Sequence, residues 1–355
     1  MTSETAPSPT ILRNELKVLG ALVVMLLVVE GVLQLGESRL SIDIQHMKSF
    51  GQIAQQLQSQ DEAATLAAER QNASTVQSAS QILFLGNSMT RYGLDQESFA
   101  RECSLTTGIT PEVIALHPDN SRISEWYYLY RNFVAEQNRS PDILVVGFAM
   151  NQLCDAPSKT PDRIARYYGV GIDDLDTLSS EDLSNVEGWS DFVCSRYSAT
   201  YATRQRVERR ILSAIIPSYK ESSNLINNQS APKELQGDNV ELTYRRLQDF
   251  LDMASGSGTE VVLVALPTQE GYDIDSGLVD VCRGKVTLID ARTIPGVSQD
   301  MIPDGLHLTP EGATRYSTFL ANWLPVQQLM ARHDRQLLHN GYAVRVASEG
   351  ERAAQ

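Results

Sequence analysis

The segment "ILFLGNSMTRYGLD", residues 82–95, decides the expected fold. It opens with a continuous apolar run, which is typical of a strand in a parallel sheet covered on both faces. Gly86-Asn87-Ser88 then forms a turn, and a polar segment follows. Taken alone, Ser88 is either a turn and cap residue or a nucleophile exposed at the carboxyl end of a strand. The rest of the chain has to separate these two interpretations.

Four more apolar runs of this kind follow, and amphipathic helical patterns alternate with them. The last helix opens with Thr309 as its cap and Pro310 at its first position. The alternation predicts a three-layer α/β/α sandwich with a five-stranded, mainly parallel sheet of flavodoxin-like order 2-1-3-4-5. The other predicted strands are 112–117, 142–150, 259–266 and 286–290.

The stretch 16–35 is apolar and about 20 residues long, enough to cross one bilayer. A cleaved signal peptide would need a small-x-small site after it, and none is convincing, which favours an uncleaved anchor. We expect residues 1–15 on the cytoplasmic side and the remaining chain outside. Glu30, near the far end of the span, is either an interfacial carboxylate or a contact with a membrane partner.

Three further segments flank or interrupt the predicted domain, which covers 81–326. Residues 36–80 carry a short helical pattern that predicts a stalk, with heptads too brief for a coiled coil. An insertion at 152–240 follows the third strand, where open α/β sheets bind ligands, and is either a lid or substrate platform or a surface decoration. Residues 327–355 form a C-terminal tail of low order.

The composition excludes some functions. The formal net charge of −14 argues against nucleic acid, which requires a basic surface. No Cys/His spacing indicates a metal site. Outside the cytoplasm, the four cysteines allow up to two disulfides, with the pairing left open. They are Cys103, Cys154, Cys194 and Cys282.

Two other places carry residues suited to acyl chemistry. Asp304 and His307 precede the last helix, and Asp-x-x-His supplies a base for a serine and a carboxylate to orient it. Asn151 follows the third strand, where its amide can donate to an oxyanion. The predicted strand order brings Ser88, Asn151 and the Asp304/His307 pair to one edge of the sheet.

With these residues in view, the chain resembles the SGNH (GDSL-like) hydrolase superfamily over roughly 81–326, insertion excluded. "FLGNSMT" resembles the block that carries the nucleophile, at Ser88. "AMNQ" resembles the block with the oxyanion asparagine, at Asn151. "DGLHLTPEGA" resembles the Asp-x-x-His block, at Asp304 and His307.

The sequence departs from the family pattern at several positions. Asn87 stands where the family has Asp, and Ala149 and Gln152 replace a Gly and an Asp beside Asn151. The family's second block supplies a glycine N–H to the oxyanion hole, but "ALHPDNSRISEW" has no glycine. Asn120 or Ser121 is the candidate for its place, because Asn tolerates a positive φ. The backbone N–H of Ser88 is a further candidate donor.

The resemblance implies a serine esterase or O-acyltransferase with a Ser-His-Asp triad and no metal or cofactor. The anchor favours acyl (acetyl) esters of cell-surface or secreted polysaccharide as substrate, with a membrane-bound acyltransferase as partner. Two alternatives stay open: a non-catalytic scaffold or glycan-binding subunit, and a membrane-tethered lipase or phospholipid esterase.

Overall fold

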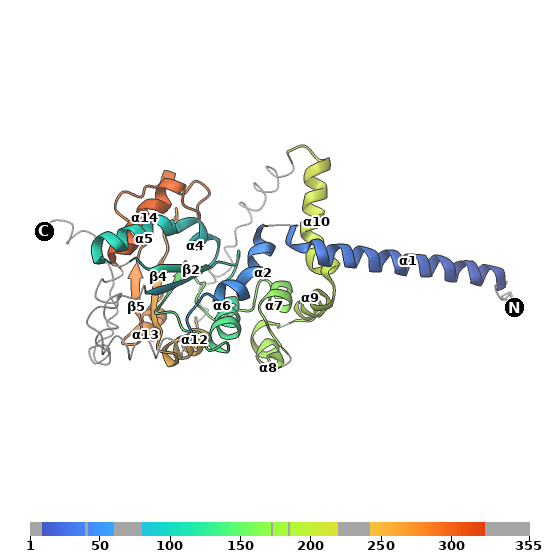
Figure 1. Ribbon diagram of the computed structural model, residues 1–355, viewed down its shortest axis with the longest axis horizontal. Coiled ribbons are helices and arrows are strands. Elements are labelled where there is room, and N and C mark those ends of the chain that lie inside the picture. The colour runs from blue at the N-terminus through green and yellow to red at the C-terminus, as the bar shows by residue number, and fades with distance from the viewer. Residues whose placement is uncertain are drawn as a thin grey trace.

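The computed structural model describes residues 9–39, 42–59, 80–108, 110–171, 173–183, 185–218 and 242–323. Its centre is a five-stranded parallel sheet of order β2-β1-β3-β4-β5, as predicted (Figure 1). Each predicted apolar run supplies one strand. The strands are β1 (Gln81–Leu85), β2 (Glu112–Leu116), β3 (Ile143–Phe148), β4 (Glu260–Ala265) and β5 (Thr287–Asp290).

Helices cover both faces of the sheet, because successive strand residues point to opposite sides and both sets are apolar. In β1, Leu83 and Leu85 join one core, while Ile82 and Phe84 join the other. The predicted three-layer sandwich is confirmed. The first core is covered by α6 (Ile123–Tyr130), η2 (Arg131–Ala135), α12 (Arg245–Gly256) and α13 (Ser276–Cys282). The second is covered by α4 (Ser88–Gly93), α5 (Gln96–Thr107) and α14 (Pro310–Trp323).

A long helix, α1 (Pro9–Gly36), projects away from the sandwich and ends in the short η1 (Glu37–Arg39) (Figure 1). By length and composition, Asn14–Arg39 suffices to cross a membrane, and its apolar side chains are exposed. The predicted anchor therefore has a matching element. On which side of a membrane the sandwich lies remains a prediction.

The segment predicted as a stalk differs from that expectation where the structure describes it. Met47 and Phe50 of helix α2 (Ile42–Ala54) are buried in the core of the sandwich, and so is Leu57, which follows the helix. Its apolar residues recur at helical spacing because that face packs on the domain. Residues 42–57 are thus part of the domain core rather than a spacer, and residues 60–79 lie outside the described chain.

The insertion forms a helical extension of the core on the side where α1 ends (Figure 1). Ile164, Tyr168, Leu178 and Phe192 are buried in the same core as the sheet. In its described part, α10 packs on α1, and Arg163 pairs with Asp43 of α2. Residues 219–241 lie outside the described residues, as does the tail at 327–355. Its elements are α7 (Pro161–Tyr167), α8 (Leu175–Thr177), η3 (Leu178–Asp182), α9 (Val186–Tyr197) and α10 (Ala199–Ile215).

The four cysteines all lie in the described chain, and none is paired with another. Three are buried and Cys194 is half-buried. Burial raises the pKa of the Cys103 and Cys282 thiols to about 12, so both stay protonated at neutral pH. Buried thiols such as those of Cys103 and Cys282 pack as small apolar side chains.

Candidate active site

Ser88 is the first residue of α4, directly after the carboxyl end of the central strand β1. Asn87 caps this helix: its Oδ1 accepts a hydrogen bond from the Met89 amide at 2.9 Å. Its Nδ2 donates to the carbonyl oxygen of Ser121 at 3.2 Å, in the loop after β2. Asn87 thus caps the helix and joins the Ser88 turn to the neighbouring loop, while Ser88 stays half-buried.

Two glycines let α4 pack close to the sheet. A Cβ on Gly86 would lie 2.0 Å from the Thr90 Oγ1, and one on Gly147 in β3 would lie 2.4 Å from the same atom. Thr90 is therefore wedged between the ends of two neighbouring strands, which holds Ser88 at the sheet edge.

The imidazole of His307 connects Ser88 to Asp304. Its Nε2 lies 2.9 Å from the Ser88 Oγ, and its Nδ1 lies 2.6 Å from the Asp304 Oδ2. The other carboxylate oxygen of Asp304 accepts hydrogen bonds from the amides of His307 (2.7 Å) and Leu306 (3.0 Å). One carboxylate therefore holds both the ring and the backbone turn that carries it.

The charge on Asp304 follows from these contacts. Partial burial by itself would raise the pKa of Asp304, but the hydrogen bonds from the His307 ring and from two amides outweigh it and lower that pKa. The carboxylate is therefore ionised at neutral pH, as the orienting member of such a relay requires.

Helix α14 anchors the turn of Asp304 and His307 against the turn of Ser88. Its cap is as predicted, since the Thr309 Oγ1 accepts a hydrogen bond from the Gly312 amide at 3.3 Å. Ser317 accepts from the Asp95 amide at 2.8 Å, and Thr314 donates to the Asp95 carboxylate at 2.9 Å. Residues more than 200 positions apart thus meet through α14, α4 and α5.

Asn151 lies in the turn after β3, the strand next to β1. Its carbonyl accepts from the Cys154 amide (3.3 Å) and thiol (2.8 Å), and Gln152 accepts from the Ala149 amide at 2.9 Å. Its half-exposed carboxamide has no hydrogen-bond partner among the described residues. The amide is thus available to a ligand, although no contact in the structure joins Asn151 to Ser88.

The loop after β2 contains the two candidates for the missing glycine. Asn120 is exposed and has a φ of 54°, the backbone conformation that was expected to need a glycine or asparagine. Ser121 is buried, and its hydroxyl donates to the Pro118 carbonyl at 2.6 Å and accepts from the Trp126 indole at 2.8 Å. The Ser121 hydroxyl is therefore occupied, and the positive φ of Asn120 favours this residue for the place of the glycine.

Sequence reasoning missed several neighbours of the site. Tyr92 is 52% exposed and meets the His307 ring edge to face, with centroids 5.0 Å apart. The Arg91 guanidinium lies over the Tyr92 ring, 5.0 Å from its centroid. The Trp126 indole also donates to the Gly86 carbonyl at 3.1 Å. Tyr92 carried one usable signal, its position four residues after Ser88 on the same helix face.

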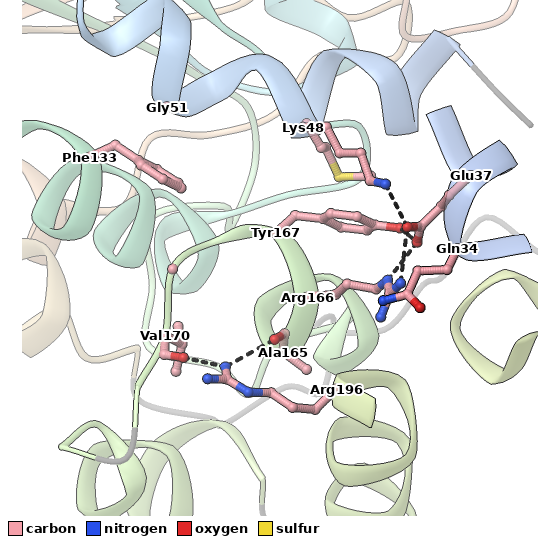
Figure 2. Close-up of a pocket in the computed structure, with 12 residues that line it drawn as sticks. Gln34, Glu37, Lys48, Gly51, Phe133, Ala165, Arg166, Tyr167, Val170 and Arg196 are labelled. Carbon is pink, nitrogen blue, oxygen red and sulfur yellow. Dashed lines mark hydrogen bonds and ion pairs between the residues drawn. The ribbon is translucent and has the colours of Figure 1, made fainter. Parts of the chain in front are cut away.

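Asp304 is exposed, and Ser88 and His307 are half-buried. A cavity of about 540 Å³ lies elsewhere, between the end of α1, α2 and α7, and none of the predicted site residues lines it (Figure 2). Within the described residues no group of His, Cys, Asp and Glu side chains is arranged to hold a metal ion.

No family model matches the chain, and no curated protein does. Among solved structures the chain is similar to a lipase, Lip_vut3, from a goat rumen metagenome. The TM-score is 0.33 and the identity 14%, over 70% of this chain and 100% of the lipase. A similarity at this level carries no argument about activity, so the function has to be argued from the geometry of the site.

Proposed function

We propose that the protein is a serine-dependent esterase or O-acyltransferase in which Ser88, His307 and Asp304 form the catalytic triad. The observation that carries this proposal is the continuous relay from the Ser88 Oγ through both ring nitrogens of His307 to the Asp304 carboxylate. The resemblance of the three sequence blocks to SGNH hydrolases supports it independently.

The first half of the reaction forms a covalent acyl-enzyme. The His307 Nε2 accepts the proton of Ser88 as the Oγ attacks the ester carbonyl, and Asp304 stabilises the imidazolium that results. Collapse of the tetrahedral intermediate breaks the bond to the leaving alkoxide, which takes the proton from His307. Water, or a hydroxyl of an acceptor, then gives its proton to His307 and attacks the acyl carbonyl. Collapse of this second intermediate breaks the bond to the Ser88 Oγ, which takes the proton back from His307.

The oxyanion of the tetrahedral intermediate needs donors at the same edge of the sheet. The unpartnered carboxamide of Asn151 and the backbone N–H of Ser88 are the candidates, with the loop at Asn120 as a third. Loss of one such donor reduces kcat by about 10²–10³-fold in comparable sites. Asn151→Ala is expected to fall in this range while Asp304 and His307 stay in place.

An acyl ester on a surface glycan is the substrate class that we favour. The triad lies outside the cavity, and its Asp304 is exposed, which suits a polymer. Tyr92 offers a half-exposed ring beside His307, a surface on which a sugar can stack. The apolar α1 would hold the enzyme at the membrane, where such glycans are exported, with the sandwich on the extracytoplasmic side.

A fluorophosphonate probe on the full-length protein tests the proposal, because it modifies only a nucleophilic serine. We expect labelling of the wild type and none of Ser88→Ala or His307→Ala, with unchanged melting temperatures as the control. Release or transfer of acetyl from donor esters to glycan acceptors then identifies the acceptor. A wild-type protein that resists the probe would instead support the scaffold or glycan-binding alternative.

A phospholipid esterase is the second candidate, favoured by the proximity of an apolar helix to the domain. It predicts turnover of phospholipid in vesicles at a rate exceeding that of acetylated oligosaccharide. The reverse order would exclude it.

A further inference from the structure

Helices α9 and α10, together with the residue that joins them, form a surface beside the end of α1. We call residues 186–216 the foot. The foot belongs to the insertion, and the triad uses none of its residues. The contact between the foot and α1 indicates which surface the foot faces.

Glu30 of α1 fixes the start of α10. Its carboxylate accepts hydrogen bonds from the Ser198 hydroxyl at 2.8 Å and from the amides of Ala199 and Thr200, the latter at 3.0 Å. These amides open the helix and have no partner within it, and the helix dipole favours a negative charge at this end. One residue of the predicted anchor thus caps a helix of the domain about 170 positions later.

This cap sets the depth of the foot along α1. Glu30 lies six residues before Gly36, or about 9 Å below the end of the helix at 1.5 Å per residue. The charge-free part of α1 ends at Val29, so Glu30 lies where the hydrocarbon layer would give way to headgroups. Helix α10 runs across α1 rather than along it, so in a membrane it would lie along the surface (Figure 1).

The foot exposes apolar side chains, as expected for a segment at the boundary between headgroups and hydrocarbon. On α10, Ile211 and Ile215 are 52% and 71% exposed, and they follow one another at i, i+4 on one face. Arg206 and Arg210, in contrast, turn back to the domain, where they meet Asp43 and the carbonyl of Arg39. The apolar face of α10 is therefore directed away from the sandwich.

Helix α9 continues the same surface. Val186, Val193 and Tyr197 share one face at i, i+7 and i+11, and two of them are more than four-fifths exposed. Tyr197 adjoins the cap at Ser198, where an amphipathic ring suits the boundary between headgroups and acyl chains. Both helices of the foot therefore carry an exposed apolar face.

The charge of α10 is opposite to that of the chain. The helix holds four arginines and one glutamate, whereas the chain carries −14. Arg204 and Arg206 pair with Asp191 and Asp43 of the protein. The charge left for a headgroup is that of Arg209 and Arg210, which are exposed and form no ion pair among the described residues. A basic helix with an apolar face is typical of segments that lie in the plane of a bilayer and bind anionic headgroups.

We propose that the foot is seated in the headgroup region of an anionic phospholipid bilayer, with α10 in the plane of the membrane. A lipid surface is the occupant because an α1 that crosses the bilayer brings the membrane to the level of Glu30. The foot and α1 together then fix the orientation of the sandwich at the membrane. This inference does not depend on the chemistry of Ser88.

Tryptophan probes in the full-length protein test the proposal. The variants are Ile215→Trp in the foot and, as matched control, Leu105→Trp on α5, which is 75% exposed. Each is reconstituted in phosphatidylcholine/phosphatidylglycerol vesicles with and without dibromophosphatidylcholine, and the signal of the wild type is subtracted. We expect bromine to reduce the Ile215→Trp emission at least about two-fold, as an interfacial position requires, and to leave Leu105→Trp unchanged.

If the bromolipid leaves the Ile215→Trp emission unchanged, as it leaves that of Leu105→Trp, the proposal is wrong. Hydrogen exchange gives a second measurement that needs no probe. In vesicles, amides 199–216 of the wild type should exchange more slowly than the same amides of Ile211→Asp/Ile215→Asp. This double variant stays membrane-bound through α1. Protection in native membranes but not in purified lipid would also overturn it, since the foot would then bind a protein.

Discussion

Asn87 shows how a single side chain can serve both the fold and the site. As an amide it accepts from the Met89 N–H and donates to the Ser121 carbonyl, and it is only 4% exposed. A carboxylate caps a helix equally well but has no proton to donate. The amide therefore ties the Ser88 turn to the loop that carries Asn120.

We predict that Asn87→Asp weakens this connection. It places a carboxylate oxygen against the Ser121 carbonyl and should lower the free energy of unfolding by about 1–3 kcal/mol. Fluorophosphonate labelling of Ser88 should slow as well. The matched control is Asn185→Asp, an exposed cap of α9 without a donor role, which should change neither measurement. Equal effects of the two substitutions would contradict the prediction.

His117, at the end of β2, predicts a pH dependence of stability. Burial, followed by the nearby positive charges of His46 and Arg91, lowers the pKa of His117 to about 3. The unfolded chain protonates this residue below pH 6.5 but the folded chain does not, so stability is lost as pH falls from 6.5 towards 3. The loss from this residue is about 2 kcal/mol at pH 5.

Urea unfolding at pH 7.5 and pH 5 measures this effect. His117→Leu places an apolar side chain in the buried position and removes the titrating group. The difference in its free energy of unfolding between the two pH values should therefore be about 2 kcal/mol smaller than that of the wild type. His46 has a pKa shifted in the same direction and should contribute to the pH dependence that remains. An unchanged difference in His117→Leu would refute the assignment.

At the scale of elements, the position of α4 depends on the two glycines that admit Thr90. Ser88 begins this helix, so any displacement of α4 moves the nucleophile away from His307, which is held separately by α14. The site is therefore sensitive to the packing of one short helix on β1 and β3.

We predict that Gly147→Ala disturbs both stability and labelling, since its Cβ would lie 2.4 Å from the Thr90 Oγ1. Overpacking of this kind costs about 1–3 kcal/mol. Gly147→Ala/Thr90→Ala should recover most of the loss, because the nearest atom left would be the Thr90 Cβ at 3.3 Å. Gly256→Ala, which faces open space, is the control. Absence of recovery in the double variant would rule out this clash as the cause.

For the whole molecule, the decisive feature is the joint between α1 and the sandwich. Glu37, fully buried, bonds to the Arg166 guanidinium at 2.6 and 3.1 Å and pairs with Lys48 at 2.7 Å (Figure 2). The Tyr167 hydroxyl also donates to it. Three residues from two helices of the domain, α7 and α2, bind this carboxylate, which makes the end of α1 part of the fold.

We predict that Glu37→Ala, which leaves Arg166 buried without its partner, lowers the free energy of unfolding by about 3–5 kcal/mol. Proteolysis between α1 and α2 should accelerate in parallel. Glu37→Met/Arg166→Met removes both charges and should cost less than the single change. Glu97→Ala, an exposed carboxylate on α5, is the control. A mild effect of Glu37→Ala would mean that the joint contributes little.

The sequence by itself determined the sheet. Five continuous apolar runs of strand length, separated by helical patterns, predict a parallel sheet with both faces buried. The order 2-1-3-4-5 is a common one among doubly wound sheets, and the structure has it. Ser88, Asn151, Asp304 and His307 were candidates for the same reason, since the carboxyl ends of parallel strands share one edge, and the structure joins Ser88, His307 and Asp304 by hydrogen bonds.

Only the tertiary structure decided the contacts that depend on distance. No local pattern shows that Asn87 would reach Ser121, that Tyr92 would meet His307, or that Glu30 and Glu37 would be bound by α10 and α7. The same holds for residues 42–57, whose periodicity shows an apolar face but not its partner. A sequence specifies which faces must be buried, whereas the partner across a contact is set by how the chain closes on itself.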